Sequence, residues 1–179
     1  MINRDTEELA ENKLLLLYIL SEAGTPLSKN QVTQVVLENN LMNYFSMQQF
    51  LAELVQKGLV VCYEDMGRHF YRIHHRGSEV LSLFLIRIPD NLKKDLKQYL
   101  TDKGMLIKRE NSVQSSYLAE SSGTYSVYLK LTPEDGASFE MKVPIASEKN
   151  AKKICAYWNE KAPDLCREIV RLLEEQDVH

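Results

Sequence analysis

Residues 44–73, YFSMQQFLAELVQKGLVVCYEDMGRHFYRI, change periodicity at Gly58, and this change decides the fold of the first half of the chain. Before Gly58, four apolar residues recur at the spacing of one helix face and should point into a core: Met47, Phe50, Leu51 and Leu54. After Gly58, two β-rich runs flank residues 64–67, a turn that ends in glycine. The stretch therefore predicts a helix followed by a hairpin.

The residues on either side extend this pattern to a whole domain. Residues 14–20, LLLLYIL, are apolar on nearly all sides of a helix, so that helix should be buried. Ser28 is placed to cap a second helix over 29–40, and another helix is expected over about 77–88. Three helices, a hairpin and a fourth helix follow the order of a winged helix-turn-helix domain, which we assign to residues 1–88.

Residues 89–179 predict a second, α+β domain. A helix from Asp90 should end at Gly104. Apolar and polar residues then alternate over 113–119, 124–131 and 137–143, with a turn signal at 133–136, which is typical of an antiparallel sheet. Two helices, beginning near Ser147 and at Pro163, should cover one face of that sheet. Dimerisation and sensing of a small ligand both remain open as the role of this domain.

Several stretches also resemble a known family. NYFSMQQFLAELVQKGLV, FYRI, RGSEVLSLF and IPDNLK are similar to a bacterial family of winged-helix proteins known mainly as a domain of unknown function. The resemblance covers essentially the whole chain. More distantly, the first half is similar to regulators of the PadR and MarR kinds, in which the third helix enters the major groove. The resemblance implies transcriptional regulation and carries no catalytic residues.

The third helix, about 43–57, offers candidate base contacts on the face turned away from the core. Glutamine can bond bidentately to adenine and serine can contact several bases, so this face predicts base readout. The candidates are Phe45, Ser46, Gln48 and Gln49. Glutamine is also simply a good helix former, and Phe45 could meet a thymine methyl, a partner subunit or the preceding loop.

Positive charge in the first half is concentrated in the hairpin, the wing of about 59–73. Residues 1–86 hold seven lysines and arginines against ten acids, which disfavours non-specific DNA coating. Residues 67–76 contain three arginines and no acid, so Arg68, His69 and Arg72 are candidate phosphate contacts. Lys29, Asn30 and Gln31 open the second helix, where backbone N–H groups also favour phosphate.

Other classes of function find little support in the sequence. There is no glycine-rich phosphate loop, nucleophile elbow, HExxH or CxxC, so we expect no enzyme, no catalytic residues and no cofactor. His74 and His75, read as strand neighbours, should point to opposite faces and bind no metal. No apolar run is long enough to span a membrane, and three cysteines without ligand spacing fit a cytoplasmic protein.

The sequence as a whole predicts a sequence-specific transcriptional regulator that binds double-stranded DNA as a homodimer. A small-molecule effector of unknown identity is a possible further partner, and Tyr157 and Trp158 are among the aromatic residues that could line its pocket. The alternative is a winged helix used as a protein–protein interaction module without DNA contact, which the acidic first half favours.

Overall fold

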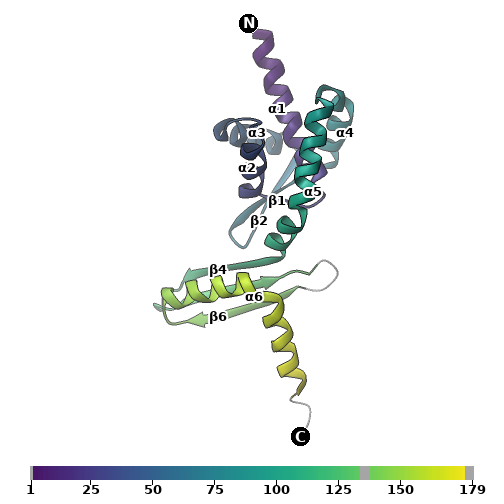
Figure 1. Cartoon of the computed structure of the whole chain (residues 1–179). Helices are drawn as coiled ribbons and strands as arrows, with labels where there is room; N and C mark the ends of the chain where they lie inside the picture. Colours follow the sequence, from purple (N-terminus) through teal and green to yellow (C-terminus); the bar gives the residue numbers. More distant parts are fainter. Residues whose placement is uncertain (1, 134–137, 176–179) are drawn as a thin grey trace. The chain divides into compact units, whose positions relative to one another are not determined.

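The computed structural model describes residues 2–133 and 138–175, with side chains described from residue 9 onward, and it divides into two compact units (Figure 1). The first unit is Met1–Lys108 and the second is Arg109–His179. Helices combine with two small antiparallel sheets, one in each unit. The chain therefore has the α+β class that the sequence predicts.

The first unit holds five α-helices, a short 3-10 helix and a three-stranded sheet in the described residues. The elements in chain order are α1 (Ile2–Glu22), β1 (Leu27–Ser28), α2 (Lys29–Glu38), α3 (Tyr44–Gln56), β2 (Val60–Asp65), β3 (Arg68–Ile73), α4 (His75–Phe84), η1 (Leu85–Arg87) and α5 (Asp90–Ser112). The strands are antiparallel in the order β1-β3-β2. In Figure 1, α2 and α3 lie on one side of α1, and α4 and α5 lie on the other.

Local capping explains where α2 and α3 begin. The Ser28 hydroxyl accepts a hydrogen bond from the Gln31 N–H (3.3 Å), and the Gln31 carboxamide accepts one from the Ser28 N–H (2.8 Å). This reciprocal pair is a capping box, which satisfies two N–H groups that a helix start leaves free. Asn43 caps α3 through its Oδ1, which accepts from the Ser46 N–H (2.9 Å).

The hairpin between β2 and β3 closes through a two-residue turn. Met66 and Gly67 have φ values of +52° and +74°. Two consecutive positive φ values give the primed turn whose twist matches paired strands. The second position is free of strain because glycine has no Cβ. The predicted hairpin is confirmed, with Val60 paired to Ile73 and Asp65 to Arg68.

The core of the first unit is built around α1. Residues 14–20 are all buried, as predicted, because α1 packs against α3, α4 and β3. The four apolar residues of α3 that the sequence assigns to the core are also buried. Three residues of α5 belong to the same core: Leu96, Leu100 and Ile107. The structure therefore places the boundary between the units at 108–109, whereas the sequence-based division puts it after residue 88.

The second unit is a three-stranded sheet with one helix packed on it. Strands β4 (Val113–Ala119), β5 (Tyr125–Leu131) and β6 (Phe139–Ile145) are antiparallel in that order, and α6 (Glu148–Glu174) covers one face. Trp158 of α6 is fully buried, and its indole N–H donates to the Lys130 carbonyl oxygen (3.3 Å). The predicted sheet with one covered face is confirmed, while residues 134–136 of the predicted turn lie outside the described residues.

Two predicted helix ends are wrong. Helix α5 continues through Gly104 to Ser112, and α6 continues through Pro163 as a single helix where two were expected. In both cases a buried residue lies beyond the breaker, Ile107 in α5 and Cys166 in α6. Tertiary packing therefore outweighs the local preference of glycine and proline to end a helix. Figure 1 shows that α6 changes direction along its length, as a proline inside a helix favours.

Candidate nucleic-acid interface

A recess of about 230 Å³, lined mainly by polar and charged residues, lies between the start of α2 and the turn of the hairpin. Its walls are formed by two short segments of the first unit: Ser28, Lys29 and Asn30 from the start of α2, and Gly67, Arg68 and His69 from the turn and the start of β3. Pairing of the strands brings them together. Ser28 of β1 lies opposite Phe70 of β3, so the first residues of α2 and of β3 become neighbours.

The recess has the electrostatic character of an anion site. The first N–H groups of a helix point outward without intrahelical partners and carry a partial positive charge, so they favour anions. The side chains of Lys29 and Arg68 add two formal positive charges at the same place. Acids also lie close, because Asp65 is paired with Arg68 across the hairpin and a Glu64 carboxylate oxygen is 3.9 Å from His69 Nδ1. These acids weaken the positive potential at the turn.

Arg72 lies outside the recess but on the same strand. Residues two apart on a strand point to the same face, so Arg68, Phe70 and Arg72 share one face of β3. The Arg68 guanidinium lies over the Phe70 ring, 5.2 Å from its centroid. Arg72 is exposed. The structure thus places four of the predicted basic or polar contacts around one recess, and Arg72 outside it on the same face of β3 as Arg68.

Gln31 was predicted to be a DNA contact, and the structure corrects that prediction. Its side chain is only 4% exposed, and its carboxamide is used in the capping box with Ser28. It therefore holds the start of α2 in place and has no surface to offer a ligand. The sequence signal was present, because a serine followed three residues later by glutamine is the capping-box pattern.

Helix α3 presents an uncovered aromatic residue in its first turn. Phe45 is 81% exposed, and its ring meets Tyr44 edge-on with centroids 5.7 Å apart. Of the three environments that the sequence left open for Phe45, packing against the preceding loop is disfavoured by this exposure. Ser46 lies beside Phe45 and is half-buried.

The two neighbouring glutamines of α3 have different surroundings. Gln49 is exposed, as predicted, and its amide donates to the Glu53 carboxylate one turn later (3.0 Å). Gln48 is half-buried rather than turned outward, and its Nε2 is buried without a hydrogen-bond partner among the described residues. The difference arises because residues next to each other on a helix lie about 100° apart, which puts Gln48 nearer the core than the sequence analysis assumed.

The histidine pair also differs from the sequence-based picture. His74 is the N-cap of α4, His75 is its first residue, and their ring centroids are 4.4 Å apart rather than on opposite faces of a strand. No group of three or more His, Cys, Asp or Glu side chains with metal-binding geometry occurs within the described ranges.

Tyr71 lies on the other face of β3 from the arginines and packs in the core of the first unit. Burial, together with the neighbouring Cys62 thiol, raises the pKa of the Tyr71 phenol to about 12. The phenol therefore stays neutral over the whole physiological range and contributes to the core rather than to the recess.

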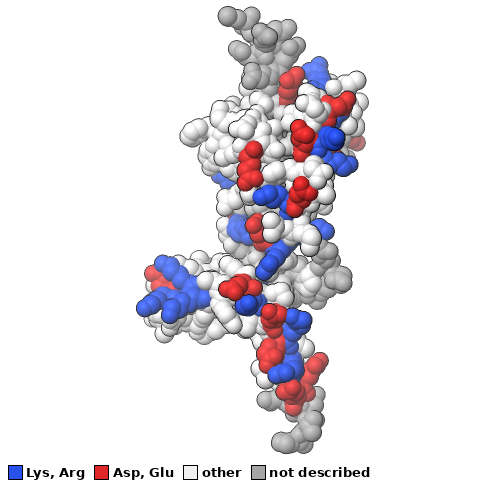
Figure 2. All heavy atoms as spheres, viewed as in Figure 1, with Lys and Arg blue, Asp and Glu red and all other residues white. Residues whose placement is uncertain are grey.

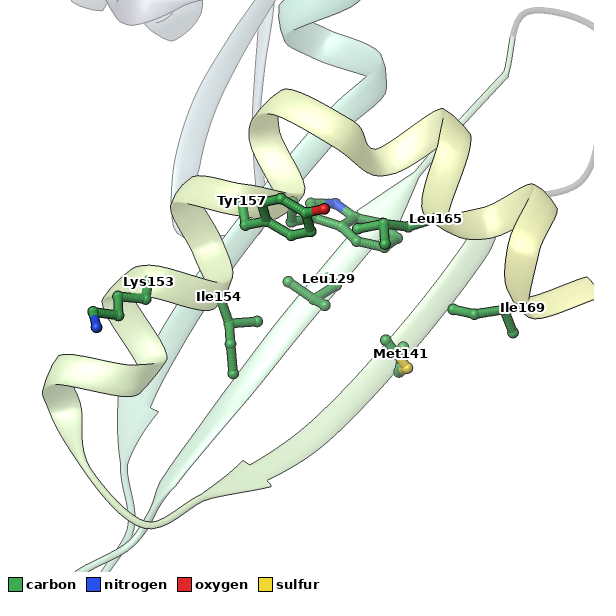
Figure 3. A pocket seen from close by; sticks show the side chains of 8 residues that line it. Leu129, Met141, Lys153, Ile154, Tyr157, Leu165 and Ile169 are labelled. Carbon is green, nitrogen blue, oxygen red and sulfur yellow. The ribbon is translucent and has the colours of Figure 1, made fainter. Parts of the chain in front are cut away.

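Two parts of the surface were missed by the sequence analysis. The first is the contribution of Ser28 and Gly67 to the recess, which depends on long-range strand pairing that no local pattern reveals. The second is the greater part of an apolar groove in the second unit, between α6 and strands β5 and β6, of which the sequence analysis named only Tyr157 and Trp158 as candidate pocket residues (Figure 3). The four-and-three spacing of Trp158, Ala162, Leu165 and Ile169 could have indicated it.

Figure 2 shows acidic and basic side chains interspersed over the visible face of the first unit, without one continuous basic surface. Within the described residues, no helix combines the length and the apolar character that crossing a bilayer requires.

Comparison with known proteins gives one result. No curated protein and no solved structure matches the chain. A family model described as a domain of unknown function (DUF4364) matches residues 12–173. Because this match runs from α1 into the last turn of α6 and includes both units, the chain belongs to the DUF4364 family.

Proposed function

We propose that the first unit is a winged helix-turn-helix domain and that the protein is a sequence-specific DNA-binding transcriptional regulator acting as a homodimer. The element order and the β1-β3-β2 sheet support this proposal, because a winged helix-turn-helix domain likewise has three helices followed by a hairpin that forms the wing. In this arrangement α3 is the recognition helix and the hairpin β2–β3 is the wing.

The observation that carries the proposal is the recess between α2 and the wing. A helix start, a lysine and an arginine converge there on one recess, and each of these features favours an anionic group such as phosphate. Arginine recognises phosphate with a planar fork of donors, and lysine does so as a point charge. A single phosphate fixed at this point would set the register of the domain along the duplex without reading sequence.

Sequence preference is assigned to the exposed first turns of α3. Gln49 has an exposed carboxamide that can exchange its bond to Glu53 for a bidentate bond to adenine. Phe45 offers an uncovered ring suited to a thymine methyl group. Affinity and specificity therefore rest on different residues, and substitutions can separate them.

The charge distribution supports modest rather than strong electrostatic binding. The first 86 residues carry more acids than bases, and Glu64 and Asp65 flank the wing turn. Each phosphate neutralised by a protein cation adds about 0.9 to the slope of log affinity against log salt. We expect a small slope, set by the few cations at the recess and on β3.

The test begins with selection of binding sites from random double-stranded DNA by the full chain. Binding of the selected duplex is then measured over a range of salt concentrations for wild type and for Lys29→Ala/Arg68→Ala. The double variant should weaken binding on all sequences and lower the salt slope by about 1.8. The matched control is Lys94→Ala/Lys97→Ala on α5, which removes the same charge from exposed positions away from the recess and should leave the slope unchanged.

A protein–protein interaction module without DNA contact is the second candidate, and the exposed aromatic pair on α3 favours it. Phe45 and Tyr44 present an apolar surface where a nucleic-acid interface would be more polar and more basic. The same selection decides between the two. If wild type enriches no DNA sequence, the recess is not a DNA contact and the interaction module replaces the regulator.

A further inference from the structure

Helix α6 carries one apolar stripe along its length, but the sheet covers only the earlier part of it. The buried members, Ala151, Trp158, Ala162 and Cys166, pack on the strands. Leu165, Ile169 and Leu172 continue the stripe at spacings of three and four residues. At the far end, Leu172 is 53% and Leu173 70% exposed. We call Leu172 and Leu173 the exposed strip of α6. Contiguous apolar surface that is exposed to solvent is characteristic of interaction sites.

A groove of about 530 Å³ lies beside this stripe, between α6 and strands β5 and β6. Figure 3 shows Leu129 and Met141 rising from the strands, with Ile154 and Tyr157 on earlier turns of α6 and Ile169 on a later one. The walls are almost wholly apolar. The second unit therefore has two neighbouring apolar surfaces, a groove and a projecting strip, and each lacks a cover among the described residues.

The charges of α6 are divided along its length. Residues 148–163 hold four lysines and two acids, a net charge of +2, whereas residues 164–175 hold two arginines and four acids, a net charge of −2. Lys149, Lys153 and Glu174 make no ion pair with any described residue. Figure 2 shows lysine and arginine side chains gathered where α6 begins. Two such helices are complementary when they run antiparallel, since each basic half then faces an acidic half.

We propose that a second copy of this chain covers the groove, with the two α6 helices antiparallel. Leu172 and Leu173 of each copy enter the groove of the other, and the acidic last turns lie beside Lys149 and Lys153. A two-fold axis makes the two contacts equivalent, so both exposed apolar surfaces of both copies are buried at once. The inference rests on the proposed homodimer and deepens it by naming the interface.

A small apolar molecule is the other occupant that the groove could take, because its volume is within the range of ligand sites. A small apolar molecule in the groove would leave Leu172 and Leu173 exposed to water. It would also make no ion pairs with the basic first half or the acidic second half of α6. A second copy accounts for the groove, the strip and the charges together.

The experiment is a charge exchange followed by sedimentation, in the absence of DNA. One variant is Lys149→Glu/Lys153→Glu and the other is Glu174→Lys/Glu175→Lys. Each variant alone places like charges opposite each other at both ends of the interface, so its dimer dissociation constant should rise at least about tenfold. An equimolar mixture restores opposite charges at both ends and should sediment as a heterodimer with about wild-type affinity.

The control is Lys94→Glu/Lys97→Glu on α5, which makes the same change of charge and should stay dimeric. Val170→Glu/Leu173→Glu provides a second disruption, at exposed positions where folding should be preserved, and circular dichroism verifies that fold. A mixture of the charge variants that stays monomeric, or separate variants that dimerise as wild type does, would overturn the interface. Because DNA is absent, this outcome is distinct from failure of the DNA-binding proposal, which the site selection measures.

Discussion

At the scale of single residues, Gln48 and Gln49 show how much one helical step changes the role of a side chain. Gln49 is exposed and bonded to Glu53, while the Gln48 amide nitrogen is buried with no partner among the described residues. The first is available to a ligand and the second carries a desolvation cost. We expect the two residues to differ in both stability and DNA readout.

Replacing Gln48 with leucine should raise the free energy of unfolding by about 1 kcal/mol. The physical reason is that a buried donor without a partner costs roughly 1–3 kcal/mol, and leucine has a similar size and helix preference without that donor. Urea denaturation of wild type and variant measures the difference. A loss of stability of more than about 1 kcal/mol would show that the Gln48 amide makes a favourable contact.

Replacing Gln49 with alanine should leave unfolding within about 0.5 kcal/mol of wild type, because the position is exposed. The same substitution should weaken the free energy of DNA binding by on the order of 1–3 kcal/mol, through lost discrimination at one base pair of the selected site. Binding to a set of single-base variants of that site provides the measurement. Gln56→Ala, at an exposed position in the last turn of α3, is the matched control and should change neither quantity. Equal losses on every duplex would remove Gln49 from base readout.

Tyr71 makes stability depend on alkaline pH. Its pKa in the folded chain is about 12, above the usual value of 10.0. An unfolded chain thus loses the phenol proton first, so the stabilisation is complete below pH 10 and is lost as pH rises toward 12. In Tyr71→Phe this dependence should be absent, so the stability advantage of wild type over the variant should shrink across that window. Thermal unfolding of both proteins from pH 9 to pH 11.5 tests the sign, and a growing advantage would contradict it.

At the scale of elements, two glycines that lie within helices differ in the space available for a side chain. A Cβ on Gly77, in the first turn of α4, would lie 2.2 Å from the Leu59 carbonyl oxygen. That oxygen also accepts a hydrogen bond from the His74 N–H (3.0 Å), so it cannot easily move away. A Cβ on Gly104, in the middle of α5, would meet nothing within 4 Å.

Gly77→Ala should therefore destabilise the chain by roughly 1–3 kcal/mol through overpacking. Gly104→Ala should stabilise it by roughly 0.5–1 kcal/mol, because alanine is the better helix former at an unstrained position. Chemical denaturation of the two variants measures these opposite signs. If Gly77→Ala is neutral, the approach of α4 to Leu59 is looser than the structure has it.

Much of the fold could be predicted from local signals, and the errors occur where distant residues decide. The start of α2 at Ser28 and the hairpin turn at Gly67 were both predicted correctly. This was possible because capping and turn geometry depend on a few adjacent residues. Gly104 and Pro163 were read as helix ends, although packing of later residues carries both helices onward. The recess around Lys29 and Arg68 could be predicted only as two separate segments, since β1–β3 pairing joins them.

At the scale of the whole molecule, a two-fold regulator should read two half-sites that lie on the same side of the duplex. Recognition helices related by a two-fold axis meet major grooves about 34 Å, or one turn of DNA, apart. The antiparallel α6 interface would supply that symmetry, and it would convert the second contact into an intramolecular one. Affinity for the full site should then exceed affinity for one half-site by far more than a factor of two.

Insertion of about five base pairs between the half-sites tests this coupling, because half a turn moves one half-site to the opposite side of the duplex. Wild type should bind the lengthened site at least about tenfold more weakly, as only one copy of α3 can engage. The variant Lys149→Glu/Lys153→Glu, at a concentration where it is monomeric, should bind the original and lengthened sites equally, since it has no second contact to lose. Its mixture with Glu174→Lys/Glu175→Lys should recover both the tight binding and the sensitivity to spacing. A wild-type affinity that is unchanged by the insertion would mean that each chain binds DNA alone, whatever the second unit assembles with.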